Sequence, residues 1–317
     1  MPLMHDPLVD TAWLETHLDD ADLRILDCTV FLRPRQEGGF SVESGREHWS
    51  QGHIPGAVHA DLKHELSDPN TRLRFMLPSA AQFADAMSRY GVGEGTRVVL
   101  YDAASNMWAA RVWWMLRVFG FDDAAVLDGG WKKWKAEGRP ISTEVPEPAP
   151  ANFVPRPREG LMATKDDVLE AMEQRRAACI IDALAEDQHQ GRVNTYGRRG
   201  HIPGSANIPA MQIVDPETNA YLPIEQLREK FQAAGALDSQ RVITYCGGGI
   251  AASSDAFVLT MLGHPDVAVY DASLSEWAED PSLPMEARAR WWRSRQLGVA
   301  AVCDAGPSAF ARERSHR

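Results

Sequence analysis

The chain contains one series of sequence blocks twice, and this duplication limits its fold more than any other feature. The phrase GHIPG occurs at Gly52 and again at Gly200, each time after an amphipathic segment and a strand-like segment. Each copy continues with a predicted helix, then a strand, turn and helix, and then a segment that ends in tryptophan. Two copies of one unit in 317 residues predict two domains of the same architecture.

Within each copy, short β-branched segments alternate with segments of helical period. Apolar side chains four residues apart, Phe83 with Met87 and Leu227 with Phe231, mark one face of a helix in each copy. Strands that alternate with helices of ten or more residues pair in parallel through crossover helices. We therefore expect an α/β fold of two domains, each a small parallel sheet flanked by helices.

A proline-rich segment between the two copies predicts the domain limits. The stretch GRPISTEVPEPAPANFVPRPREG holds six prolines, which favours an extended, semi-rigid linker. The expected units are an N-terminal domain at 1–145, the linker at 146–160, a C-terminal domain at 161–285 and an arginine-rich tail at 286–317.

Charge and composition exclude several functional classes. The formal net charge of -11 argues against general nucleic-acid binding, because phosphate recognition needs a concentrated positive field. No run approaches the roughly 18 apolar residues that a membrane span needs. The start MPLMHDPLVDTAW has no cationic stretch before an apolar core, and it carries acids that a mitochondrial presequence avoids. We expect a soluble, cytoplasmic protein with no nucleic-acid or membrane partner.

One of the cysteines stands in an unusual place. The four cysteines form no CxxC pair, so neither a disulfide framework nor a metal site is expected: Cys28, Cys179, Cys246 and Cys303. Cys246 follows the strand-like RVITY and precedes Gly247, Gly248 and Gly249, which allow positive φ before a helix starts. Backbone N–H groups can then converge on the sulfur and lower its pKa. We expect an accessible, nucleophilic thiolate.

Aligning the two copies places Asp102 where the second copy has Cys246. The first domain is therefore expected to support the second, which does the chemistry. Two other interpretations of Cys246 stay open: a buried cysteine that only allows close packing of strand on helix, and the nucleophile of a cysteine phosphatase. The phosphatase loop needs a guanidinium, and no arginine follows Cys246 before Arg288. The loop suits a small sulfur species better than a phosphate ester.

Together these motifs resemble the tandem-domain rhodanese family, the thiosulfate and 3-mercaptopyruvate sulfurtransferases. The resemblance covers about residues 7 to 285 and rests on GHIPGA, GHIPGS, WAARVWWMLRVFG, LDGGWKKW, TYCGGGIAAS and YDASLSEW. It implies a catalytic C-terminal domain, an inactive N-terminal domain and chemistry without a cofactor. Cys246 then attacks the outer sulfur of a small anionic donor, becomes a persulfide, and passes that sulfur to cyanide or a thiol acceptor.

The resemblance also assigns residues to the site. The loop that supplies N–H donors to the substrate looks like Gly247, Gly248, Gly249, Ile250 and Ala251. Other residues have minor expected roles: Arg117 as an ion-pair partner, Asp27 and Asp182 as loop organisers, Ser273 and Trp277 at the border of the cleft, and Cys28 and Cys179 in the core.

Two further residues carry open alternatives. Arg111, in AARVWW, is similar to the family arginine that reaches across the cleft to the donor's anionic end, a role that suits a guanidinium. Its alternative is an ordinary surface arginine. His53 is a candidate for proton transfer, as the mercaptopyruvate branch implies. His201 opens the second HIPG identically, so a shared structural turn explains both histidines more simply.

The donor and the acceptor stay open. The thiosulfate branch typically has cations directly after the cysteine, and this chain has Gly247 and Gly248 there. The mercaptopyruvate branch typically has CGSGVTA, whose hydroxyls are replaced here by Gly248 and Ala251. A non-catalytic rhodanese-like binding or regulatory module is the alternative function. A monomer suffices for either function, because two domains in one chain already supply a complete cleft.

Overall fold

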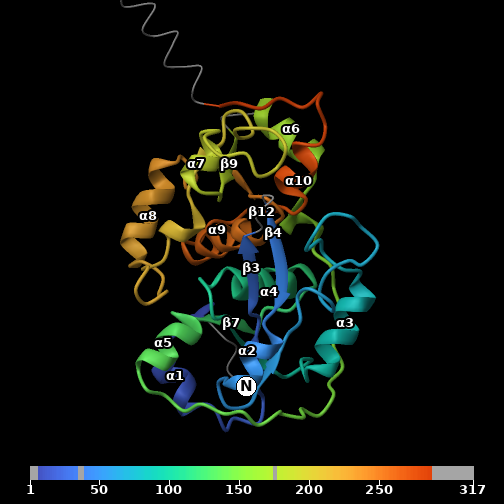
Figure 1. The fold of residues 1–317 in the computed structure, drawn as a ribbon, viewed down its shortest axis with the longest axis vertical. Helices are drawn as coiled ribbons and strands as arrows, with labels where there is room; N and C mark the ends of the chain where they lie inside the picture. Colours follow the sequence, from blue (N-terminus) through green and yellow to red (C-terminus); the bar gives the residue numbers. More distant parts are fainter. Residues whose placement is uncertain (1–5, 35–38, 174–176, 288–317) are drawn as a thin grey trace, which may run out of the picture.

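The computed structural model describes residues 6–34, 39–173 and 177–287. It contains two α/β domains that follow one another along the long axis of the molecule (Figure 1). The predicted tail therefore lies outside the described residues, apart from Glu286 and Ala287. In the described part of the chain, no helix is long and apolar enough to cross a membrane.

Each domain is built on a five-stranded parallel sheet, and the two sheets have the same strand order. The first sheet runs β1 (Leu8–Val9), β7 (Ala124–Leu127), β6 (Arg97–Tyr101), β2 (Leu23–Asp27) and β5 (Ala57–His59). The second runs β8 (Met162–Ala163), β12 (Val267–Tyr270), β11 (Arg241–Tyr245), β9 (Ala178–Asp182) and β10 (Ala206–Asn207). Each strand has its counterpart at the same place, which confirms the predicted fold.

Helices cover both sheets (Figure 1). In the first domain they are α1 (Thr11–Thr16), α2 (Arg46–Gln51), α3 (Ala80–Arg89), α4 (Met107–Val118) and α5 (Gly130–Ala136). In the second they are α6 (Lys165–Glu173), α7 (Glu186–His189), α8 (Ile224–Ala233), α9 (Ile250–Met261) and α10 (Ser273–Trp277), with short 3-10 turns η1 (Glu159–Leu161) and η2 (Ala210–Gln212). The first domain also has an antiparallel hairpin, β3 (Val30–Pro34) with β4 (Phe40–Ser44), that the sequence analysis did not predict.

The two domains meet through α4 and α9, which pack against each other at the centre of the molecule (Figure 1). Nearly every side chain of both helices is buried, and Trp113 of α4 meets Phe257 of α9 edge to face at 4.8 Å. A helix that is apolar on all sides is stable only when covered all round. This contact explains why neither helix shows a clear amphipathic pattern in the sequence.

Two hydrogen bonds from a backbone N–H group to an aspartate side chain also join the domains, one in each direction. The N–H of Leu77, in the first domain, donates to Asp271 Oδ2 of the second at 2.8 Å. The N–H of Tyr221, in the second domain, donates to Asp128 Oδ1 of the first at 2.8 Å. Asp128 and Asp271 each follow the strand before the last helix of their domain. The duplication therefore extends to the interface, where each domain uses the same position to hold the other.

The proline-rich linker is extended, as predicted, and it is also docked on the first domain. Residues 143–158 have no regular secondary structure. The N–H of Ala151 donates to the Ser88 carbonyl at 3.0 Å, and Phe153 is buried against Phe83. The domain limits themselves stay a prediction.

Candidate functional site

Cys246 lies at the carboxyl end of β11, where the chain turns into α9. Its backbone N–H donates to the Ser273 hydroxyl at 3.0 Å, and its carbonyl accepts from the N–H of Leu274 at 3.1 Å. Ser273, which the sequence placed only at the border of the cleft, thus fixes the backbone of Cys246. Its own hydroxyl donates to the Tyr270 carbonyl at 2.7 Å. The cysteine is held between β11, α9 and the start of α10.

Backbone N–H groups face the sulfur, but burial dominates its ionisation. The exposed fraction of Cys246 is only 3%. Burial raises the pKa of its thiol above the usual value of 9.0, and the N–H groups of Ala252, Gly248 and Ala251 act against that rise. Two of the five predicted donors, Gly248 and Ala251, act on the sulfur, and Ala252 joins them. For Gly247, Gly249 and Ile250 the donor role stays a prediction. The prediction of an accessible thiol with a lowered pKa is wrong. It considered the N–H groups that stabilise the thiolate, but not the burial that destabilises it.

The three glycines after Cys246 serve different purposes. Only Gly249 has a positive φ, +77°, and a β-carbon there would lie 2.4 Å from Asp271 Oδ1. Gly247 is required by a neighbour, since its β-carbon would lie 1.8 Å from the hydroxyl oxygen of Tyr196. At Gly248, the nearest atom to a β-carbon is the Arg74 carbonyl oxygen at 3.5 Å, an ordinary contact. The sequence predicted conformational freedom at all three.

A segment of the first domain, residues 72–77, covers the Cys246 loop. The carbonyl of Arg74 lies against Gly248, and the N–H of Leu77 is held by Asp271. At the start of the segment, Arg72 forms an ion pair with Glu279 of the second domain. The first domain therefore borders the Cys246 loop through this segment.

Arg111 reaches across the domain boundary, as predicted, but its guanidinium is already engaged. It is fully buried, at 0% exposure, so the alternative of a surface arginine is wrong. Nη1 lies 2.6 Å from Asp271 Oδ1, Nη2 donates to the Phe75 carbonyl at 2.6 Å, and the group stacks over Trp114 at 4.7 Å. A β-carbon at Gly249 would lie 2.8 Å from Nη1. Arg111 thus connects the covering segment, Asp271 and the Cys246 loop.

Tyr196 is a site residue that the sequence analysis missed. It lies in the stretch between α7 and His201, and its ring and hydroxyl fill the side-chain space of Gly247. Burial, and then the negative charges of Cys246 and Asp182, raise the pKa of its phenol well above the ordinary range. The first GHIPG copy has no tyrosine at this spacing, so the repeat gave no signal for it.

The candidate proton-transfer residue His53 lies in a structural turn. It is fully buried, with Nδ1 2.8 Å from the Trp49 carbonyl and Nε2 3.0 Å from the Glu144 carbonyl. Its backbone pairs with Ser142, as the backbone of His201 pairs with Glu286. The shared turn accounts for both histidines, and both ring nitrogens of His53 face backbone carbonyls.

The minor predictions from the sequence are mostly met. Asp27 and Asp182 accept the N–H groups of Thr29 and Leu184 and so organise the loops that follow their strands. Asp182 also holds His189 at 2.8 Å. Arg117 lies 3.8 Å from Asp122. Trp277 is buried, and its indole N–H donates to the Pro284 carbonyl. Cys28 is fully buried.

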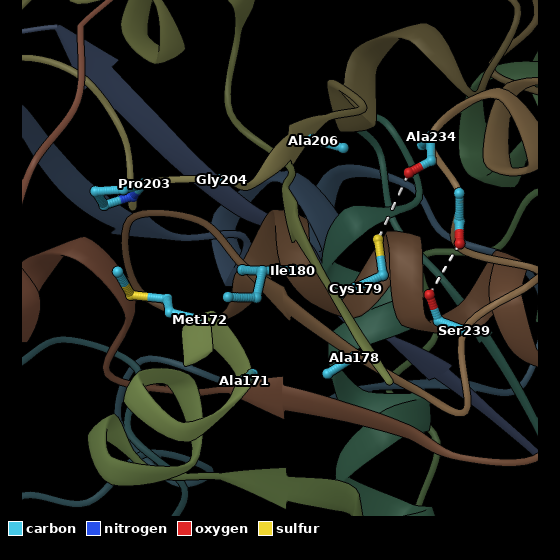
Figure 2. A pocket seen from close by; sticks show the side chains of 11 residues that line it. Ala171, Met172, Ala178, Cys179, Ile180, Pro203, Gly204, Ala206, Ala234 and Ser239 are labelled. Carbon is cyan, nitrogen blue, oxygen red and sulfur yellow. Dashed lines mark hydrogen bonds between the residues drawn. The ribbon is translucent and has the colours of Figure 1, made fainter. Parts of the chain in front are cut away.

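Cys179 is only half-buried and lines a small cavity away from the Cys246 loop, at the amino end of β9 (Figure 2). The cavity measures about 180 Å³ and lies between α6, β9 and the end of α8. Cys179 Sγ points to the Ala234 carbonyl at 3.7 Å, and burial raises the pKa of its thiol to about 11. The prediction that it lies in the core is therefore only partly met. Cys303 lies outside the described residues.

The equivalent loop of the first domain holds a carboxylate where the second holds the thiol. Asp102 follows β6 and accepts four backbone N–H groups at 2.8–3.2 Å, from Ala104, Asn106, Trp108 and Ala109. Trp108 and Ala109 occupy the same places in α4 as Ala251 and Ala252 in α9. Both turns thus build the same N–H cradle.

Comparison with known proteins agrees with this architecture. The Rhodanese-like domain profile matches residues 10–137 and 164–280. Thiosulfate/3-mercaptopyruvate sulfurtransferase 2 of Arabidopsis thaliana is 33% identical, over 89% of this chain and 86% of its own. Thiosulfate sulfurtransferase of Rattus norvegicus is 34% identical, over 87% and 93% of the two chains. The sulfur carrier protein TtuD of Thermus thermophilus is 32% identical, over 88% and 95%.

Solved structures give the same answer. SseA from Escherichia coli, described as a 3-mercaptopyruvate sulfotransferase, superimposes with a TM-score of 0.75 at 30% identity, over 84% of this chain and 98% of its own. The 3-mercaptopyruvate sulfurtransferase from Leishmania major does so with a TM-score of 0.73 at 25% identity, over 88% and 76%. The chain therefore belongs to the rhodanese-like family, among its sulfurtransferases with two rhodanese-like domains.

Proposed function

We propose that Cys246 carries the sulfur that this sulfurtransferase transfers. The observation that carries the proposal is the N–H cradle of Gly248, Ala251 and Ala252 around the only cysteine that ends a central strand at the domain boundary, among the residues described. A cradle of this kind stabilises a sulfur anion. Cys28 and Cys179 lie within the fold of their own domains, and in the described parts of the chain no backbone N–H group acts on either sulfur.

The reaction has two steps that balance without a cofactor. In the first, the Cys246 thiolate attacks the outer sulfur of thiosulfate or the thiol sulfur of 3-mercaptopyruvate, and a new S–S bond forms while the bond from that sulfur to the leaving group breaks. With thiosulfate the electron pair leaves with sulfite. With 3-mercaptopyruvate it leaves as the enolate of pyruvate, which takes up one proton. In the second step an acceptor such as cyanide or a thiol attacks the outer sulfur and releases the Cys246 thiolate.

Because burial raises the pKa of the Cys246 thiol, other groups in the site must stabilise its thiolate. The thiolate is the nucleophile, and burial disfavours it. An anionic donor alone opposes ionisation further, so the N–H cradle and a nearby cation must offset both effects. The loop after Cys246 has no charged side chain at Gly247 and Gly248. The cation must therefore come from another segment of the protein. Thiosulfate and 3-mercaptopyruvate are both anions, so both need such a cation in the site.

Arg111 is the proposed cation for the anionic end of the donor. Its guanidinium lies beside Gly249, and its pairing with Asp271 fixes that position. A donor that binds Arg111 must share it with Asp271 or displace that carboxylate. We assign no step to His53, because both of its ring nitrogens face backbone carbonyls.

The remaining proposals concern the setting of the reaction. The acceptor is cyanide or a thiol, a monomer is sufficient for activity, and the protein acts in the cytoplasm. The domain limits near residues 145 and 161 complete this description. Size-exclusion chromatography tests the monomer, and cell fractionation tests the location.

The decisive experiment measures sulfur transfer and the site of the added sulfur together. The purified protein is incubated separately with thiosulfate and 3-mercaptopyruvate, thiocyanate is measured after addition of cyanide, and intact and peptide masses are recorded. We expect one added sulfur, on the peptide that contains Cys246, with at least one donor. Cys246→Ser should show neither the added sulfur nor thiocyanate. A wild-type protein without turnover or a mass gain contradicts the proposal and favours a non-catalytic binding module.

A further inference from the structure

The phenol of Tyr196 occupies the space where a side chain of Gly247, the residue after Cys246, would stand. Its hydroxyl oxygen, Cζ and Cε1 lie 1.8, 2.1 and 2.5 Å from the point where a β-carbon of Gly247 would stand. The absence of a side chain at Gly247 is therefore what allows the phenol to contact the loop. The charge of Cys246 also acts on the phenol of Tyr196, so the two side chains lie near each other.

The chain on both sides of Tyr196 is fixed to the second domain. The N–H of Thr195 donates to Gln188 Oε1 at 3.2 Å. Arg198 donates from Nη1 to the Asp280 carbonyl at 2.9 Å and from Nη2 to the Leu283 carbonyl at 2.8 Å. The ring also packs against the apolar cluster that contains Tyr245. The phenol is thus held by its own domain and does not depend on the covering segment.

The hydroxyl of Tyr196 has a proton to donate and, among the described residues, no partner for it. The hydroxyls of Tyr90 and Tyr270 donate to carboxylates, and that of Tyr245 is bonded to Ser205 and to the N–H of Ile202. A partly buried phenol usually finds a hydrogen-bond partner. The raised pKa of Tyr196 keeps the phenol neutral, so it acts as a donor and not as a base.

We infer that the Tyr196 hydroxyl donates a hydrogen bond to the outer sulfur of the Cys246 persulfide. This inference rests on the proposed function. The persulfide carries its negative charge on the outer sulfur, one S–S bond beyond the sulfur that the backbone cradle faces. The phenol adds the donor that the cradle lacks for that atom. No proton is transferred: Cys–S⁻ and thiosulfate give Cys–S–S⁻ and sulfite, and the hydrogen bond lowers the energy of the persulfide anion.

The test compares two identical substitutions at tyrosines with unpartnered hydroxyls. Tyr196→Phe removes the proposed donor and keeps the ring. Tyr221→Phe removes a buried hydroxyl that also lacks a partner in the described part of the chain, in a loop that contacts the first domain. Both variants retain the other charged groups near the Cys246 loop, Asp182 and the pair of Arg111 with Asp271.

The persulfide is formed on each protein with thiosulfate or 3-mercaptopyruvate and labelled with iodoacetamide across a pH series. For Tyr196→Phe we expect the half-point of persulfide labelling to rise by about one pH unit and kcat/KM to fall by about tenfold, as for loss of a hydrogen bond to a charged group. Tyr221→Phe should leave both quantities unchanged. Equal melting temperatures of the two variants show that folding is not the cause.

A second variant approaches the same contact from the other side. The β-carbon in Gly247→Ala must displace the phenol, so this variant should reproduce the pH shift, and adding Tyr196→Phe to it should cause little further change. Unchanged labelling and kinetics in Tyr196→Phe overturn the inference and leave the proposed function intact. Equal shifts in Tyr196→Phe and Tyr221→Phe also overturn it. A wild-type protein that gains no sulfur overturns the proposed function itself.

Discussion

The two strand-to-helix turns at Asp102 and Cys246 use the same scaffold to hold different anions. In the first domain the Asp102 carboxylate accepts four N–H groups and fills its own cradle permanently. In the second domain the cradle faces the thiol of Cys246, which we propose gains one sulfur and gives it up again. Burial raises the pKa at both positions, against the pull of the donors. Under the proposed function, the side chain at this position decides whether the turn binds a carboxylate or carries the transferred sulfur.

The two turns also differ in length and in the residue that adopts the left-handed conformation. The turn of the first domain has one more residue, and its left-handed position is Asn106, whereas the second domain has Gly249 there. The Asn106 side chain donates to the Asn219 carbonyl of the other domain at 2.7 Å. At the Cys246 turn, the glycine leaves that space to Arg111 and Asp271. The left-handed residue of the first turn thus contacts the other domain with its own side chain, whereas the space at Gly249 is occupied by Arg111 and Asp271.

The largest effect is expected from exchanging the two anions. Cys246→Asp should give the second turn the same occupant as the first, so the protein should fold while sulfur transfer falls by at least roughly a thousandfold through loss of the nucleophile. Thiocyanate formation and the melting temperature check this. Residual transfer comparable to wild type would show that another thiol carries the sulfur.

The next largest effect is a loss of stability when Asp271 or Asp128, the two aspartates that join the domains, loses its paired cation. Arg111→Met leaves Asp271 beside the loop without its cation, so the free energy of unfolding should fall by about 3–5 kcal/mol. The matched change, Lys133→Met, removes the more exposed partner of Asp128 at 3.2 Å and should cost at most about 1 kcal/mol. Urea unfolding measures both. Equal losses would contradict the asymmetry between the two aspartates.

A pH effect is expected in the first domain. Burial raises the pKa of Asp27 to about 6, against hydrogen bonds from Thr29 and Tyr101, and the charge of Asp102 adds to the rise. Since the folded state holds this proton more tightly than the unfolded state, stability is lost as pH rises from about 4 to about 6, by about 3 kcal/mol.

Asp27→Asn removes that loss, so its stability relative to wild type should improve by a similar amount between pH 4 and pH 7. Urea unfolding at both pH values measures this difference. The matched variant of the second domain, Asp182→Asn, loses the contact with His189 and should be less stable than wild type at pH 7. A difference between Asp27→Asn and wild type that is independent of pH would contradict the prediction.

The smallest effect distinguishes the glycines. Gly249→Ala forces a side chain into a left-handed position 2.4 Å from Asp271 Oδ1 and should cost about 1–3 kcal/mol. Gly248→Ala meets only an ordinary contact and should change stability by less than about 0.5 kcal/mol. Thermal unfolding compares the two. A larger loss in Gly248→Ala would mean that its environment is tighter than its distance to the Arg74 carbonyl indicates.

The fold was predictable because its signals are local and occur twice. Each GHIPG copy comes with the same order of strands and helices, and the resulting sheets match strand for strand. The hairpin β3–β4 was missed because only one copy has it, so the repeat could not indicate it. The turn at Cys246 was predictable for the same reason, since a strand, small residues and a helix start are contiguous in the sequence.

The environment of that turn was not predictable, because it is assembled from distant segments. Arg111 is 160 positions from Asp271, and nothing in the neighbourhood of either residue indicates the pairing. Tyr196 fills the space beside Gly247 from a stretch that the first copy lacks. Residues 72–77 of the other domain contact Gly248 and Asp271 beside Cys246. Local pattern gives the donors around the sulfur, and tertiary contacts decide its pKa.

The reciprocal hydrogen bonds from Leu77 to Asp271 and from Tyr221 to Asp128 also bear on how such a duplicated chain can evolve. After duplication, each half became part of the other's architecture, so neither can be exchanged, lost or recombined alone without exposing α4 or α9 and separating residues 72–77 from the Cys246 loop. Chimeras that join halves of different relatives should tolerate the linker as a crossover point only when both contacting loops come from compatible parents. The repeat is visible in the sequence, while the packing of α4 against α9 joins the two copies into one structure.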